Sequence, residues 1–180
     1  LDTRPDGLAI EDEWILAEFQ TTMNTVEQAW SNLDIYTATQ ALKTFGTGVL
    51  PSHYLEMVKS RLYDEDKQAA WTLHRVVRDF MSAFTPVCPF FTHHVSSTIY
   101  GQSSVDVDAF PEAPHPETGV GTEHGDALRA ISSSLQTFNS DTWGYKKEQG
   151  ISLNQPVSGV VIPEELKAFT AILTRMHSLE

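Results

Sequence analysis

Seven histidines and one cysteine, Cys88, are the side chains of this 180-residue sequence that are best suited to bind a transition metal. No two histidines are four residues apart, so none form the pair that zinc sites on a helix commonly use. His93 and His94 are adjacent, and in a helix they would point about 100° apart. A single cysteine also excludes an internal disulfide and a cysteine-rich zinc site. We therefore predict no metal site.

Nucleophilic catalysis requires a more specific arrangement than this sequence provides. Serine, histidine and aspartate are all present, but no serine lies in the glycine pattern of a nucleophile elbow. The segment Gly119-Val120-Gly121 follows no predicted strand and has no lysine or arginine nearby, both of which a phosphate-binding loop would need. The sequence therefore predicts no catalytic residue and no bound cofactor.

The charge balance narrows the choice of partners. Acidic residues outnumber basic residues by 24 to 12, and the formal net charge is −12. This balance argues against nonspecific DNA binding and against a polybasic membrane anchor. No apolar run approaches the roughly 18 residues of a membrane-spanning helix, and the first residues lack the features of a signal peptide. We expect a cytoplasmic protein that binds neither DNA nor membranes, with a surface adapted either to high intracellular salt or to solubility alone.

Apolar residues recur at spacings of three and four through most of the first hundred residues, which predicts a series of amphipathic helices. The helical stretches are 15–33, 35–49, 54–63, 69–84 and 89–99. Asp34 is suited to cap the second of them. Gly46 and Gly48 should weaken the end of that second helix, and Pro51 should kink or stop it.

The second half of the chain has a more mixed pattern. Glycine and proline are frequent over residues 101–123, which we interpret as a long surface connection. A sixth helix is predicted over 128–138 and a buried strand over 157–162. Pro163 should open a last helix that extends to Met176.

The predicted fold class is therefore mainly α. We expect an antiparallel helical bundle over residues 1–140, followed by a small strand-plus-helix appendage over 141–178. Leu179 and Glu180 resemble the residues left before an expression tag.

Several short motifs occur in a characteristic order along the chain. They are Asp12–Leu16 at the start of the first helix, Tyr54–Tyr63, Ala70–Val77, Thr85-Pro86 with Pro89–Thr92, Ile99-Tyr100, Ser104-Val105 before Phe110–Glu112, and Lys146–Glu148 with Gly150–Pro156. Together they resemble the anticodon-binding domain of the tRNA synthetases for valine, isoleucine and leucine. The resemblance covers almost the whole chain and is closest to valyl enzymes of archaeal type.

Two motifs favour the valyl branch, namely Leu55–Lys59 and Ser152-Leu153-Asn154 before Pro156. The sequence departs from the family pattern at Phe110, where a tryptophan is usual, and over Thr44–His53, where glycine and proline replace a more aromatic helix. The equivalent domain of an isoleucyl or leucyl enzyme remains an alternative. A helical scaffold that binds another protein is a further alternative.

The resemblance implies that this chain binds the anticodon region of the tRNA for valine. The His-x-Gly-His tetrapeptide and the lysine-rich loop of the family's catalytic domain are absent from the 180 residues. The chain itself is therefore not expected to be an enzyme. ATP and magnesium would belong to a catalytic domain of the same protein, which is the second expected partner.

The resemblance also implies candidate RNA contacts near the junction of the second and third helices. They are Lys43, Lys59 and Arg61 for backbone phosphates, and His53 and Tyr54 for base stacking. Helical spacing places Lys59 and Arg61 on opposite edges of the third helix. Lys59 is the better placed to pair with Glu56, whereas Arg61 would either contact RNA or pack its stem. Tyr54 would lie either in the core or on the RNA face.

Overall fold

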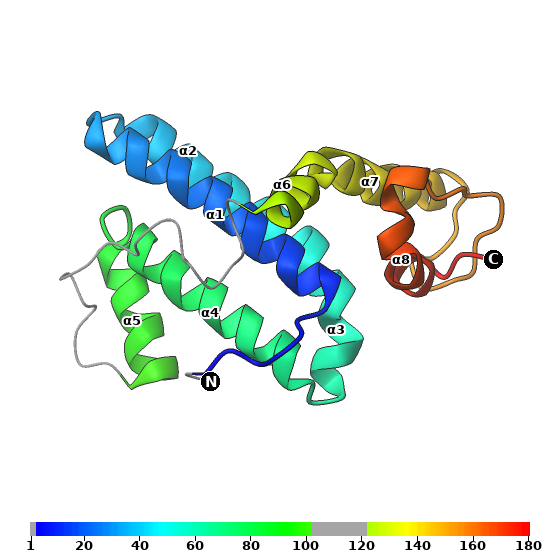
Figure 1. Cartoon of the computed structure of the whole chain (residues 1–180), viewed down its shortest axis with the longest axis horizontal. Helices are drawn as coiled ribbons and strands as arrows, with labels where there is room; N and C mark the ends of the chain where they lie inside the picture. Colours follow the sequence, from blue (N-terminus) through cyan, green and yellow to red (C-terminus); the bar gives the residue numbers. More distant parts are fainter. Residues whose placement is uncertain (1–2, 102–121) are drawn as a thin grey trace.

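Helices make up most of the protein, as the spacing of apolar residues predicts. A computed structural model describes residues 3–101 and 122–180. The first part contains α1 (Ile10–Ser31), α2 (Ile35–Thr44), the π-helix η1 (Phe45–Tyr54), α3 (Leu55–Tyr63), α4 (Lys67–Phe84) and α5 (Pro89–Tyr100). The second part contains α6 (Glu123–Ala130), α7 (Ser132–Glu148), the 3-10 helix η3 (Glu164–Phe169) and α8 (Thr170–His177). Figure 1 shows α7 and α8 extending from one end of the bundle.

Helix α1 is the centre of the bundle because it contacts α2, α4, α6, η1 and η3. Its inward face is fully enclosed, and Trp14 and Ile15 have no exposed surface. Phe19 of α1 lies 5.1 Å from Phe45 of η1, between ring centroids, and Phe45 lies 6.1 Å from Phe80 of α4. This chain of aromatic rings joins three helices and forms the middle of the core.

The second and third predicted helices are joined without a break. Asp34 caps the start of α2 by accepting a hydrogen bond from the Thr37 amide, as predicted. The predicted stop at Pro51 does not occur, because α2, η1 and α3 follow one another as a continuous helix. In an α-helix, the proline ring would clash with the carbonyl four residues earlier. The wider turn of the π-helix gives that ring more room, so the chain passes Pro51 while remaining helical.

Gly46 is required by packing within η1. A Cβ atom at this position would lie 2.6 Å from Cζ of Phe80, whereas a Cβ atom at Gly48 would meet nothing within 4 Å. We expect Gly46→Ala to lower the free energy of unfolding by about 1 to 3 kcal/mol, because Phe80 must move within a packed core. Gly48→Ala is the matched control and should be neutral or stabilising by up to about 1 kcal/mol. Urea unfolding followed by circular dichroism would measure both, and equal effects would contradict the packing argument.

The C-terminal part differs from the sequence prediction in two respects. The predicted strand over 157–162 is wrong: Val157 forms a single bridge with Leu179, and Val161 is 84% exposed. The described part of the chain contains no second strand with which residues 157–162 could form a sheet. The sixth predicted helix is two helices, α6 and α7, and α7 continues through residue 140, where we expected the bundle to end. The predicted connection over 101–123 lies mostly outside the described residues.

Lys146 on α7 is fully buried, although lysine is usually a surface residue. Its ammonium group donates hydrogen bonds to the backbone carbonyls of Leu153, at 2.8 Å, and Gln155, at 2.7 Å. Burial lowers the pKa of Lys146 below its ordinary value. The side chain therefore fastens the exposed loop 151–156 to α7.

Candidate nucleic-acid interface

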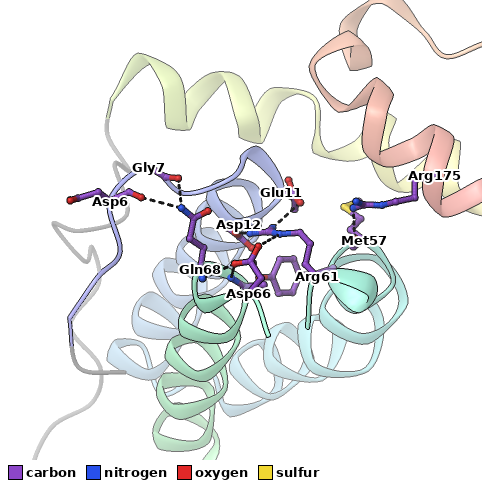
Figure 2. Close-up of polar contacts among 11 residues, drawn as sticks. Asp6, Gly7, Glu11, Asp12, Met57, Arg61, Asp66, Gln68 and Arg175 are labelled. Carbon is purple, nitrogen blue, oxygen red and sulfur yellow. Dashed lines mark hydrogen bonds and ion pairs between the residues drawn. The ribbon is translucent and has the colours of Figure 1, made fainter. Parts of the chain in front are cut away.

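Arg61 is the centre of a buried ion-pair cluster that joins α1, α3 and the start of α4 (Figure 2). Three of its nitrogen atoms lie 2.8 Å from a carboxylate oxygen: Nη1 from Glu11, Nη2 from Asp12 and Nε from Asp66. The Arg61 side chain is 13% exposed, and those of Glu11 and Asp12 are 4% and 0% exposed. The planar guanidinium group suits this arrangement, because its donors point in fixed directions toward separate acceptors.

The same carboxylates organise the neighbouring chain. Oδ1 of Asp66 accepts the amides of Gln68 and Ala69, and so caps α4. The hydrogen bond from Arg61 lowers the pKa of Asp66 below its ordinary value, which keeps this cap ionised. The Gln68 side chain in turn donates to the carbonyls of Asp6 and Gly7, so the segment before α1 lies against the start of α4 (Figure 2).

Tyr54 is also part of this interior. Its hydroxyl donates a 2.6 Å hydrogen bond to Oδ1 of Asp12, and the residue has no exposed surface. Burial and the adjacent Asp12 carboxylate raise the pKa of Tyr54, so its hydroxyl keeps its proton. The edge that carries Tyr54, Met57 and Arg61 is therefore turned toward the other helices, and of the two alternatives left open for Tyr54 and Arg61 the structure shows the buried one.

His53 lies in a second buried network. Its Nδ1 accepts a 3.2 Å hydrogen bond from the Asn139 amide, and its ring stacks on Trp143 with centroids 5.8 Å apart. Asn139 Oδ1 accepts a 2.8 Å hydrogen bond from Nε2 of His177 on α8. Burial lowers the pKa of His53, and burial together with the Lys146 charge lowers the pKa of His177 to about 4. Both rings are therefore uncharged near neutral pH, and they join η1, α7 and α8.

Lys43 and Lys59 are the two predicted RNA-binding residues that lie exposed. They are sixteen residues apart and lie on either side of the ten-residue η1, Lys43 in α2 and Lys59 in α3. The structure therefore does not bring them together. Nζ of Lys59 lies 3.6 Å from Glu56, which confirms the predicted pair, but both side chains remain about half exposed. Such a surface pair contributes little and is easily rearranged.

The outward side of α3 contains a candidate contact that the sequence analysis missed. Glu56, Lys59, Ser60 and Tyr63 are all exposed and share this side, which we call the α3 outer face. Tyr63 is 80% exposed and lies one turn after Lys59. The sequence does indicate an outward position for Tyr63, because a helical wheel places this residue on the side of the helix opposite Met57, Val58 and Arg61. The α3 outer face offers a cation, a hydroxyl group and an exposed aromatic ring within two turns.

Arg175 of α8 is a further exposed cation near α3. Its Nη2 lies 3.5 Å from the carbonyl oxygen of Met57 (Figure 2). Over residues 3–101 and 122–180, no carboxylate pairs with Arg175. This contact places one positive charge of the C-terminal part beside the bundle.

In the described ranges, no group of three or more histidine, cysteine or acidic side chains has the arrangement of a metal site. None of the helices in those ranges is long and apolar enough to cross a membrane.

Comparison with known proteins identifies the family. The family described as anticodon-binding domain of tRNA ligase matches residues 12–162. The chain is 29% identical to the valine–tRNA ligase of Saccharolobus solfataricus over 86% of its own length, and 32% identical to that of Methanothrix thermoacetophila over 88%. It is 26% identical to the valine–tRNA ligase of Aeropyrum pernix over 97% of its length. The chain spans only 18 to 22% of these relatives. Because the match extends from the start of α1 to beyond α7, the chain belongs to the family of anticodon-binding domains of tRNA ligases.

Proposed function

We propose that this chain is the tRNA-recognition unit of a valine–tRNA ligase and binds the anticodon stem-loop of the tRNA for valine. The family match is the observation that supports this proposal, and the specificity for valine is inferred from the names of the relatives. The amino acid would be activated by a catalytic domain of the same protein, which would also bind ATP and magnesium. The location would be the cytoplasm, where tRNA is charged.

The α3 outer face is the RNA contact that the geometry supports best. Single-stranded RNA loops are recognised by stacking unpaired bases on aromatic rings and by neutralising the flanking phosphates. Tyr63 presents an exposed ring for stacking, and Lys59 presents an ammonium group one turn away. Lys43 remains a candidate for a separate phosphate contact at the other end of the helix.

A net charge of −12 limits how strongly RNA can bind. Charges farther apart than about 8 Å are largely screened at physiological salt, so binding depends on the few cations near the RNA. We therefore propose weak binding by the isolated chain, with a dissociation constant on the order of 10⁻⁴ to 10⁻⁶ M.

The proposed function is tested by titrating the chain with valine tRNA and with an unrelated tRNA at matched salt. Tighter binding of valine tRNA supports it. Preference for isoleucine or leucine tRNA would assign the chain to another branch of the class. Equal or absent binding of every tRNA would instead favour a protein-binding scaffold.

Substitutions on the α3 outer face should weaken binding of valine tRNA. Tyr63→Ala should cost about 1 to 3 kcal/mol of binding free energy through loss of base stacking. Lys59→Glu should cost on the order of 1 kcal/mol by repelling phosphate. Lys167→Glu is the matched control, because Lys167 is exposed and pairs with Glu164 at the same i,i+3 spacing. If Tyr63→Ala and Lys59→Glu bind no more weakly than the Lys167→Glu control, the α3 outer face does not contact the RNA.

A further inference from the structure

A groove with both apolar and polar lining lies between α1 and α2 and reaches η1 and α7. Its volume is about 640 Å³, which lies within the range of sites that hold small ligands. Twelve residues line the groove, and half of them carry a hydroxyl group, counting one tyrosine. Only Glu18 among the twelve has a formal charge at neutral pH. On a protein with a net charge of −12, this groove is a nearly neutral region that RNA can approach.

The α1 wall of the groove presents hydrogen-bond acceptors. The hydroxyl groups of Thr21, Thr22 and Thr25 each donate to the backbone carbonyl four residues earlier, at 3.1 Å. Their protons are therefore used within the helix, and the oxygen lone pairs remain available to a ligand. The three threonines share one side of α1, because their spacings of three and four correspond to one helical turn. This wall is suited to a ligand that donates N–H groups.

The α2 wall supplies a different set of groups. The Tyr36 ring is 73% exposed at the edge of the groove, so that one of its faces can stack on a planar ligand. The Gln40 side chain can both donate and accept hydrogen bonds. Lys43 follows Gln40 by one turn and has no carboxylate partner among the described residues. A ring, an amide and a cation thus lie along the same helix.

The chemistry of the two walls matches an unstacked nucleobase. Bases are planar, and adenine, cytosine and guanine carry exocyclic amino groups that need acceptors. The phosphate attached to such a base would lie outside the groove, where Lys43 is exposed. Glu18 adds a further acceptor, and burial raises the pKa of its carboxyl group, so that its charge is held less firmly than in water.

We propose that this groove binds one amino-bearing base extruded from an RNA loop, with Tyr36 stacking on the base and the α1 threonines accepting its amino protons. The inference rests on the proposed function, since it assigns a base-binding subsite within the same RNA-binding unit. The subsite is distinct from the α3 outer face, because it lies on α1 and α2.

The test uses a synthetic RNA hairpin that copies the anticodon stem-loop of a valine tRNA. Tyr36→Ala and Thr25→Val should each weaken hairpin binding about fivefold or more, the loss expected for one hydrogen bond or stacking contact. Thr170→Val is the matched control, because Thr170 is exposed and its hydroxyl also donates to a backbone carbonyl. Circular dichroism would show that each variant remains folded.

A second set of hairpins isolates the amino group. In each hairpin one loop base is deaminated, adenine to inosine or cytosine to uracil. The unaltered chain should bind a hairpin more weakly when the deaminated base is the one that the groove holds. The same change should have a smaller effect on Thr25→Val than on the unaltered chain, because one of the acceptors of the amino group is already missing. If the hairpin binds but Tyr36→Ala and Thr25→Val have no effect, the groove proposal is overturned while the proposed function remains. If the unaltered chain binds no hairpin or tRNA, both fail.

Discussion

Replacing Arg61 with alanine should lower the free energy of unfolding by about 3 to 5 kcal/mol. The guanidinium group pairs with three carboxylates, and two of them, Glu11 and Asp12, are almost fully buried. Without Arg61 these two like charges would remain beside each other without a cation and with little water. Urea unfolding at neutral pH, followed by circular dichroism at 222 nm or so, measures the loss.

Two variants make this expectation specific. Lys59→Ala removes an exposed cation two residues away and should change the free energy of unfolding by less than about 0.5 kcal/mol. Arg61→Lys keeps the charge but lacks the planar fork of donors, so an intermediate loss is expected. An Arg61→Ala variant as stable as the unaltered chain would show that the cluster is not structural. Because Arg61 stabilises the fold, an Arg61 variant should lose RNA binding through unfolding. Its folded fraction must therefore be measured before a loss of binding is assigned to a missing RNA contact.

Acidification from pH 6.5 toward pH 4 should destabilise the protein through His177. The folded state lowers the pKa of His177 to about 4 from its ordinary value of 6.5, so between these values the unfolded chain binds more protons. Stability is therefore fully present above about pH 6.5 and is lost as the pH falls toward 4. Protonation would also place an N–H group on the buried Nδ1 atom, which has no hydrogen-bond partner within residues 3–101 and 122–180. We expect this group to contribute on the order of 2 kcal/mol to the change.

His177→Gln separates this contribution from that of the many carboxylates. Glutamine can still donate to Asn139 but does not titrate in this range. The groups that face His177 are Lys146 from α7, which also opposes its protonation, and, through Asn139, His53 from η1. The free energy of unfolding of His177→Gln should fall less steeply between pH 6.5 and pH 4 than that of the unaltered chain. Parallel curves would show that His177 titrates normally.

The helices could be predicted because each one buries a stripe of its own apolar residues. That information is local, and it correctly located α1, α4 and α5. The strand over 157–162 was mistaken because an apolar run alone does not distinguish a strand from an extended connection. Val160 and Ile162 instead pack against the hydrophobic core, and Val161 faces solvent. Whether such a run becomes a strand or an extended connection depends on the positions of helices that are distant in the sequence.

The candidate site was less predictable for the same reason. The Lys59 and Glu56 pair depends on residues one turn apart and was found from the sequence. The role of Arg61 depends on Glu11 and Asp12, which are 50 and 49 residues away along the chain. The first turn of α1 is acidic, as suits a helix N-terminus, but two of its members, Glu11 and Asp12, face inward to Arg61. Burial of a charged residue follows from its partners, which the sequence pattern does not reveal.

The π-helix between α2 and α3 also determines where the two helices point around their common axis. A π-helix forms its hydrogen bonds over five residues instead of four, so it turns through a smaller angle per residue than an α-helix. The ten residues of η1 therefore shift the rotational phase of α3 relative to α2. Loss or gain of one residue within η1 would rotate α3 about its axis, and with it both the exposed Lys59 and Tyr63 and the buried Met57 and Arg61. The length of η1 therefore sets the direction in which the α3 outer face points relative to the exposed side of α2.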